Sequence, residues 1–411
     1  MDNYKTTSTR VTMPAVQDKR LEQMFNQFLR DQLAACMNTD AENSHQEALQ
    51  HSLEQLTELL LINSRPDHDQ LADAFSESNI RLLNSFKLAD LNETELNQSF
   101  INKHGLVISV KDTLNTVNDI YRVRSFIRGI HSALNETDSS RVTHIVYPAC
   151  GPFAPLLLPL IRHYKAKGVF SPNLKISLLD IQPGAVKVLN QLIDDLDIRE
   201  YIHEVLCMDV MDYQPELPID LLVLEALQHG FTKEGHMAFA CHLSQFLSAE
   251  ARMIPEKLSV TAFLNKGQRE YVDQWKDQER AHSDFLDSEI QNERIMLGEI
   301  FSLTLETLKS IKLIPFGENA RLVECNQITI PQDIPDINKY ILNLAVNIAT
   351  YSTETLNEYD SGITCPVPDM SVCIDFKPKA PEPDDLLVKS GDKIKFYYKM
   401  TATPGFLPTI A

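Results

Sequence analysis

The chain has 411 residues, of which 43% are hydrophobic and 23% charged, an ordinary globular composition long enough for about two or three domains. Its formal net charge of −19, without clustered lysines and arginines, argues against a nucleic-acid-binding protein and suits a cationic substrate. No apolar run reaches the roughly 18 residues of a membrane-spanning helix, and the N-terminal segment lacks the apolar core of a secretory signal. The seven cysteines form no CxxC pair, which favours reduced thiols in a cytoplasmic protein over a disulfide framework or a structural zinc site.

Residues 1–100 are predicted to form an N-terminal helical region. Apolar residues recur at helical spacing in three stretches, which predicts three helices that each bury one face. We interpret them as a small helical bundle and a candidate oligomerisation element. The stretches are "LEQMFNQFLRDQL" (21–33), "ALQHSLEQLTELLL" (48–61) and residues 71–86 with Leu71, Phe75, Leu82, Leu83 and Phe86.

Residues 101–255 are predicted to form a doubly wound parallel sheet. The strand-like runs "HIVYPAC", "LKISLLDI", "HEVLCMDV" and "IDLLVLEAL" alternate with the helical patterns "APLLLPLIRHY" and "AVKVLNQLIDDL". Ligands of such sheets bind outside the carboxyl ends of the strands, near the point where the strand order reverses. The residues that end each strand are therefore the candidates for chemistry.

Residues 256–411 are predicted to form an antiparallel β domain. A polar stretch of helical character over residues 268–301 comes first. The strand-like pieces "RLVECNQITI", "LNLAVNIATY", "MSVCIDF" and "DKIKFYYKM" follow it. Breaks rich in proline and aspartate, such as "KPKAPEPDD", separate them, which is typical of antiparallel sheets.

Three successive strands of the predicted parallel sheet end in a carboxylate, at Asp180, Asp209 and Glu225, and the first strand ends in a turn at Gly151. A glycine turn before a helix exposes backbone N–H groups, and an acid after the next strand typically accepts hydrogen bonds from ribose hydroxyls. Asp209 could accept one from the amine of an adenine. Together these residues predict an adenosine-type cofactor whose far end is positively charged. Taken singly, Gly151 is also explained by a tight turn and Asp180 by a helix cap.

The stretch "LEALQHGFTKEG" (224–235) places Glu225 and Glu234 nine positions apart, directly after the fourth strand. This pattern resembles the S-adenosylmethionine-dependent methyltransferases, and among them the arginine N-methyltransferase family, which carries two glutamates at this spacing in a hairpin loop. "NDIYRVRSFIRGI" resembles the family's segment over the cofactor, "RMIPEKLSVTAFL" its link to a β-barrel, and "DLLVKSGDKIKFYY" a late pair of barrel strands. The resemblance covers roughly residues 100–400.

The resemblance implies a Rossmann-like S-adenosylmethionine-binding domain over residues 101–255 and a β-barrel-like domain over residues 256–411. It implies catalytic roles for Glu225 and Glu234, without a metal. The family's helical arm packs on the nucleotide domain of a partner chain, so we expect a homodimer with its arm at about residues 266–300. The residues implied for S-adenosyl-L-methionine are Arg122, placed to meet the methionyl carboxylate, with Gly151, Asp180, Asp209 and Val210.

Two glutamates suit a guanidinium substrate because this planar fork of N–H donors pairs bidentately with carboxylates. A guanidinium bound by a carboxylate on each side would have one terminal nitrogen directed at the sulfonium methyl. Such orientation of the reacting groups supplies much of the rate acceleration of an enzyme. The methylated product carries one surplus proton, which a glutamate or a neighbour must accept. Alternatively, Glu225 is a helix N-cap and Glu234 a solvated surface residue. Each residue alone favours this alternative, whereas the pair with its flanking segments favours catalysis.

The chain departs from the family at three places. Gly151 stands alone where the family has several glycines, and "HGLVISVKDTLNT" replaces the family's Tyr-Phe-x-x-Tyr segment. In the barrel loop, "GITCPV" puts Thr364 and Cys365 in place of the family's threonine and histidine. His229, inside the double-glutamate loop, is a candidate for accepting the proton. His229 and His236 are seven positions apart, which does not match a helical metal pair.

The predicted function is methyl transfer from S-adenosylmethionine to the guanidino group of free L-arginine or another small guanidino compound. The departures in the N-terminal segment and barrel loop favour a small acceptor over an extended protein segment. Protein arginine is the alternative acceptor, and a non-catalytic scaffold that binds a partner through its helical bundle is a second alternative. Thr116 lies near the place of the family's bulky gatekeeper, so a roomier pocket is expected, and the number of methyl groups added stays open.

Overall fold

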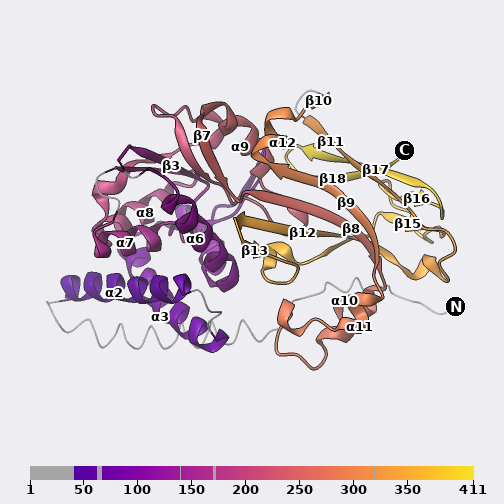
Figure 1. Ribbon diagram of the computed structural model, residues 1–411, viewed down its shortest axis with the longest axis horizontal. Helices are drawn as coiled ribbons and strands as arrows, with labels where there is room; N and C mark the ends of the chain where they lie inside the picture. Colours follow the sequence, from indigo (N-terminus) through magenta and orange to yellow (C-terminus); the bar gives the residue numbers. More distant parts are fainter. Residues whose placement is uncertain (1–40, 63–66, 139, 170–172, 318–319) are drawn as a thin grey trace.

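Figure 1 shows the computed structural model of the chain, which describes residues 41–62, 67–138, 140–169, 173–317 and 320–411. Helices surround a parallel sheet in one region, and antiparallel sheets form a second region beside it. The chain crosses between them from β7 (Leu247–Ile254) to β8 (Lys257–Asn265). Of the helices in these ranges, none has both the length and the apolar character needed to span a bilayer.

Two N-terminal helices pack against the outer face of the first region (Figure 1). α2 (Ala41–Leu61) and α3 (His68–Leu88) bury the leucine stripes that their sequences predict, which confirms two of the three predicted helices. The pair contacts α6 (Ile120–Asn135), α7 (Leu158–Lys167) and α8 (Pro183–Asp195). The predicted helix over residues 21–33 lies outside the described residues.

The first region contains the predicted parallel sheet, with strand order β5-β4-β3-β6-β7. The chain runs outward from the central strand β3 through β4 to β5, and then returns to the other side of β3 with β6. The order therefore reverses between β3 and β6, whose carboxyl ends flank the expected ligand crevice. The strands are β3 (Thr143–Pro148), β4 (Leu174–Asp180), β5 (Ile202–Cys207), β6 (Ile219–Val223) and β7.

Helix α6 joins the two regions. The side chain of Asp119 accepts a hydrogen bond from the Arg122 N–H and so caps the start of the helix. Gly129 lies against strand β12 (Ile341–Tyr351), where an added Cβ would come within 2.9 Å of the Thr350 Oγ1. The Thr350 hydroxyl donates to the Ser125 carbonyl at 2.9 Å. Only glycine permits this close approach, which ties α6 to the antiparallel region.

The second region consists mainly of two antiparallel sheets, as the alternating pattern of its strands predicts. One sheet has the order β10-β11-β17-β18, and the other has the order β13-β12-β8-β9, with β14 also paired to β12. A short parallel pair, β15 and β16, lies beside them. The remaining strands are β9 (Ile295–Thr304), β10 (Leu313–Phe316), β11 (Ala320–Thr329), β13 (Glu354–Leu356), β14 (Val367–Asp369), β15 (Val372–Ile374), β16 (Leu386–Val388), β17 (Lys393–Met400) and β18 (Gly405–Ile410).

The predicted helical arm at residues 266–300 is partly wrong. Its helices are short, with α10 (Gly267–Tyr271) and α11 (Ser288–Asn292) separated by 3-10 turns, and residues from Ile295 onward belong to β9. β9 pairs with β8 and buries Ile300 and Leu303. Within the predicted arm, β9 begins with the largely apolar stretch "IMLGEI" (295–300), which is typical of a strand and not of a polar helix.

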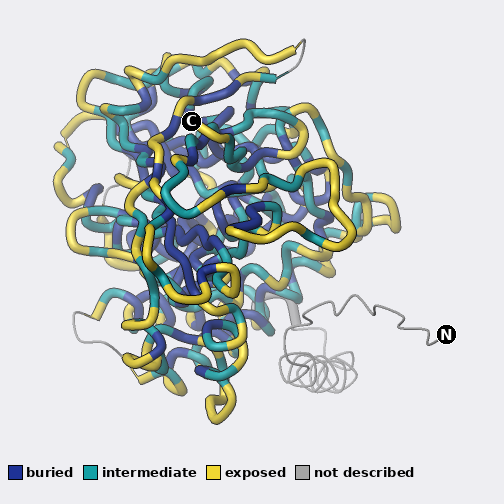
Figure 2. Tube along the Cα trace, turned by 90° about the vertical axis from the view of Figure 1, so that its right-hand side faces the viewer, coloured by how far each residue is buried: buried dark blue, intermediate teal, exposed yellow. Residues whose placement is uncertain are grey.

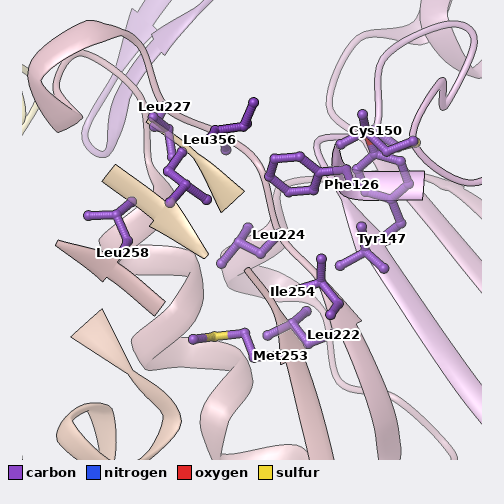
Figure 3. Packing of buried hydrophobic residues seen from close by; sticks show 14 of the residues in the cluster. Phe126, Tyr147, Cys150, Leu222, Leu224, Leu227, Met253, Ile254, Leu258 and Leu356 are labelled. Atoms are coloured by element: carbon purple, nitrogen blue, oxygen red, sulfur yellow. The ribbon is translucent and has the colours of Figure 1, made fainter. Parts of the chain in front are cut away.

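One hydrophobic core continues through both regions. Figure 3 shows it where they meet, with Phe126 of α6 and Tyr147 of β3 on one side and Leu258 and Leu356 of the antiparallel region on the other. Figure 2 shows the buried residues in the interior, with exposed loops around them. The continuous core fixes the parallel sheet relative to the antiparallel sheets.

Candidate active site

The turn after β3 and the end of β4 meet at the expected edge of the sheet. The Gly151 N–H donates to the Asp180 Oδ2 at 2.9 Å, and the Gln182 N–H donates to the Oδ1 at 2.8 Å. Burial raises the pKa of Asp180 to about 6 against the effect of these donors. Gly151 has a φ of +66°, and no described atom lies within 4 Å of where its Cβ would be. The turn therefore leaves space beside a buried carboxylate.

Gly151 does not open a helix, contrary to the expectation from its sequence. The following helix α7 begins only at Leu158, and the Gly151 N–H is already donated to Asp180. Asp209 follows β5, where its side chain accepts from the Met211 N–H at 2.9 Å and caps the 3-10 helix η3 (Val210–Asp212). Val210 is buried beneath that cap. These residues lie at the predicted edge, with local structural roles of their own.

The loop that carries the two glutamates folds back on itself. Gln228 and Thr232 form an isolated antiparallel bridge, and Gly230, Phe231 and Lys233 all have positive φ between 55° and 69°. Such backbone is costly for residues other than glycine, and it persists only where the surroundings hold it.

Phe231 anchors this loop in the antiparallel region, a role that the sequence analysis missed. Its ring is fully buried among Phe301 of β9, Tyr398 of β17 and Phe406 of β18, with centroid distances of 5.7, 4.8 and 6.5 Å. The Lys233 N–H donates to the Pro404 carbonyl at 3.1 Å. A lone aromatic residue in the polar turn "HGFTKE" is the signal that could have revealed the anchor.

Glu225 forms a buried ion pair with Arg122. The Arg122 Nη1 lies 2.6 Å from the Glu225 Oε2, and the two side chains are 7% and 9% exposed. The Nη2 donates to the Thr116 carbonyl, whereas the buried Nε has no partner among the described residues. Burial raises the pKa of Glu225 although Arg122 opposes the shift, and Glu225 in turn raises the pKa of Arg122 against its burial.

Glu234 lies close enough to Glu225 to be affected by its charge. Its Oε1 accepts from the Gln228 side-chain amide at 2.9 Å. Burial, and next the negative charge of Glu225, raise the pKa of Glu234 to about 7. Neither glutamate fits the alternative of a cap and a solvated residue: Gln228 holds the N-cap position of the 3-10 helix η4 (His229–Phe231), and Glu234 is partly buried.

The barrel loop contacts the site through a serine. The Ser361 hydroxyl donates to the Asp119 Oδ2 at 2.5 Å, and the Gly362 N–H donates to the same oxygen at 3.1 Å. Thr364 is fully buried in a capping box with Ser361, and burial raises the pKa of Cys365 to about 11. The Ser361 side chain and the Gly362 backbone thus both bond Asp119, and the serine hydroxyl cannot hold a proton as a histidine does.

A hairpin that the sequence analysis did not predict covers the double-glutamate loop. It consists of β1 (Phe100–Asn102) and β2 (Gly105–Val107), and the Leu106 N–H donates to the Lys233 carbonyl at 2.7 Å. A Cβ on Gly105 would lie 2.6 Å from that carbonyl oxygen. Nearby, the Gln182 amide donates to the carbonyls of Gln98 and Ile108 at 2.8 and 3.0 Å. The segment "HGLVISV" thus closes one side of the site.

The two histidines near the loop differ in surroundings. His236 is 1% exposed against the Phe231 ring, and burial lowers its pKa to about 3. Burial and the charge of Lys233 lower the pKa of His229. Within the described ranges, no three side chains of the types His, Cys, Asp and Glu gather as a metal site.

The residues present fit an adenosine cofactor with an amino-acid end. The open turn at Gly151 lies beside the Asp180 carboxylate, and the Arg122 Nε is a buried donor with no acceptor among the described residues. A buried donor of this kind is costly unless a ligand uses it.

Comparison with solved structures finds similarity to a chain of the Trypanosoma brucei PRMT1 enzyme–prozyme heterotetrameric complex with AdoHcy. The two chains share 12% identity over 70% of this chain and 87% of the other, with a TM-score of 0.37. No protein-family model and no curated protein sequence matches the chain.

Proposed function

We propose that the protein is an S-adenosylmethionine-dependent methyltransferase that acts on the guanidino group of arginine. The observation that carries the proposal is the pair Glu225 and Glu234, which share one largely buried site with Arg122, whose Nε has no partner in the described part of the chain. Two neighbouring carboxylates in a largely buried site are costly unless they bind a cation. Arg122 neutralises one of them, and a second cation would neutralise the other.

Five residues would hold the cofactor. The Arg122 Nε would donate to its carboxylate, Asp180 and the turn at Gly151 would receive the ribose, and Asp209 with Val210 would border the adenine. When bound, S-adenosylmethionine supplies an electrophilic methyl group on a sulfonium.

The substrate guanidinium would lie between the two glutamates. Arg122 occupies the Oε2 of Glu225 and Gln228 the Oε1 of Glu234, so the other oxygen of each carboxylate can accept a guanidinium N–H. Charge-assisted contacts from two sides would fix the plane of the guanidinium and the direction of its terminal nitrogen.

Glu234 is the best-supported acceptor of the surplus proton. Its pKa of about 7 matches a group that must be ionised to bind the substrate and protonated after transfer. Burial lowers the pKa of His229, so this residue is a weaker base than an ordinary histidine and is not favoured as the proton acceptor.

We favour free L-arginine or another small guanidino compound as the acceptor, because the β1–β2 hairpin packs directly on the double-glutamate loop. Mass spectrometry after incubation with S-adenosylmethionine and either free L-arginine or an arginine-rich peptide tests this. Methylation of free arginine alone supports the proposal, and methylation of the peptide alone makes the protein a protein arginine methyltransferase. Methylation of neither, with no thermal shift by the cofactor, favours the non-catalytic scaffold.

We also propose a cytoplasmic homodimer. The six described cysteines are free thiols, as this location requires. The segment 266–294 extends from the antiparallel region, as α10 and α11 in Figure 1 show, and would contact the partner. Light scattering of the purified 46.6-kDa chain should give twice this mass, and a monomer would refute the dimer.

A further inference from the structure

The junction between the 3-10 helix η1 (Leu114–Asn118) and α6 is held from two sides. On one side, the Asn79 amide of α3 donates to the Asn118 Oδ1. On the other, Ser361 and Gly362 of the barrel loop donate to Asp119. Two adjacent residues thus connect the N-terminal helices and the antiparallel region to the start of the helix that carries Arg122.

Asn79 lies where an apolar side chain would be expected. It is 8% exposed and borders a cavity of about 20 Å³, room for roughly one water molecule, whose wall includes Phe75, Leu82, Val117 and Phe153. A buried amide among such residues is costly unless it is hydrogen-bonded. The bond to Asn118 therefore accounts for a polar residue at this position.

The hydrogen bond between Asn79 and Asn118 is linked to the candidate active site through the η1 turn. The Thr116 carbonyl of the same turn accepts from the Arg122 Nη2, and the Arg122 Nη1 bonds Glu225. The backbone position of η1 therefore sets where the guanidinium lies relative to Glu225. α3 also reaches the turn after β3, where Phe86 meets Phe153 edge to face at 6.2 Å.

We infer that Asn79 is a positioning residue of the active site: through Asn118 it fixes the η1 turn that holds the Arg122 guanidinium against Glu225. The inference rests on the proposed function for its catalytic meaning. On this inference, the α2–α3 pair supports the site indirectly, because Asn79 of α3 holds the η1 turn in place.

Asn79→Ala, Asn118→Ala and the double variant test the inference, with Ser78→Ala as the matched control. Ser78 is buried on the same helix, and its hydroxyl bonds the Ser52 carbonyl of α2. The first readout is amide hydrogen exchange of residues 114–122 in the full chain. The loss of one hydrogen bond should speed this exchange by about 3- to 10-fold in both single variants. The double variant should be no faster than either single variant, because both remove the same bond.

The second readout is calorimetric affinity for S-adenosylhomocysteine together with the kcat and KM of methyl transfer. We expect the affinity to fall by about 3- to 10-fold in the single variants and to stay unchanged in Ser78→Ala. Asn79→Asp should restore it, because Asn118 can turn its amide to donate to the new carboxylate.

The two readouts separate this inference from the proposed function. Unchanged exchange at residues 114–122, or additive effects in the double variant, would overturn the role of Asn79 even if the enzyme is active. Faster exchange in a protein that methylates no guanidino compound would support the coupling of Asn79 to Arg122 and refute the proposed function.

Discussion

Among the residues that the structure describes, two arginine–glutamate pairs have both side chains less than 10% exposed, and they differ in how completely they are hydrogen-bonded. In the site, Arg122 and Glu225 are 7% and 9% exposed; in the segment after β8, Arg294 and Glu270 are 6% and 0% exposed. The Arg294 Nε and Nη2 both bond Glu270, and its Nη1 bonds Glu358. Arg122 makes one bond to Glu225, and its Nε makes none among the described residues.

The carboxylates respond to this difference. Burial would raise the pKa of Glu270, but hydrogen bonds from Arg294 and Tyr359 outweigh it, and the pKa is lowered. For Glu225, burial prevails and the pKa is raised. A buried ion pair whose donors and acceptors are all hydrogen-bonded within the protein stabilises the fold. A buried pair that keeps donors and acceptors without protein partners can use them to bind a ligand. We therefore propose a structural role for the Arg294–Glu270 pair and a functional role for the Arg122–Glu225 pair.

The largest effect is expected from Glu225→Gln. Loss of one carboxylate should lower kcat for guanidino methylation by about 100- to 1,000-fold, because the substrate cation loses one of its two charge-assisted contacts. Affinity for S-adenosylhomocysteine should stay within about threefold, because glutamine still accepts from Arg122. Full activity in this variant would mean that the double glutamate is wrongly assigned.

Glu270→Gln should act on stability instead. Replacing the carboxylate by an amide leaves the buried Arg294 cation with Glu358 as its remaining charged partner, which costs about 3 kcal/mol of unfolding free energy in urea titrations. The rate of methyl transfer per folded molecule should not change. A selective loss of activity without loss of stability would reverse the roles given to the two pairs.

Glu234 provides a test by pH. Its folded pKa of about 7 exceeds the ordinary value of 4.5, so the folded protein binds the extra proton and loses stability as pH rises from 4.5 to 7. The loss should amount to about 3 kcal/mol, and Glu234→Gln should remove this slope in denaturation curves. In wild type, kcat/KM should rise through about pH 7 as Glu234 ionises. A flat profile across this range would contradict the shifted pKa.

The smallest effect is expected from Phe231→Leu. A smaller side chain in the aromatic cluster should cost about 1 kcal/mol of stability and let the double-glutamate loop shift. Misplaced glutamates should lower kcat by about tenfold. Phe406→Leu, in the same cluster but outside the loop, is the control and should lose similar stability with nearly full activity. Equal activity losses in both variants would show that the anchor has no special role.

The sequence predicts those parts of the candidate site that follow from the alternation of strands and helices along the chain. Carboxyl ends of parallel strands share one edge, so the strand pattern predicts Asp180, Asp209 and Glu225 at the same edge of the sheet, and their role as a site stays a prediction. The strand pattern likewise predicted the parallel sheet and the main strands of the antiparallel region.

The parts that were missed depend on contacts between distant residues. Asp119 and Ser361 are 242 positions apart, and no local pattern links them. Phe231 is buried by strands that come much later in the chain, and the short β1–β2 hairpin has three residues per strand, too few for a periodic signal. The end of the expected arm belongs to β9, whose largely apolar stretch "IMLGEI" (295–300) pairs with β8, and this pairing joins residues that are distant in the sequence.

The most direct test of the contrast between the two pairs is the NMR signal of the arginine Nε–Hε groups, with Arg122→Lys and Arg294→Lys used for assignment. On titration with S-adenosylhomocysteine, the Arg122 signal should shift and become protected from exchange, while the Arg294 signal stays in place. An Arg122 signal that does not move while calorimetry shows binding would contradict the claim that this buried donor is kept for a ligand.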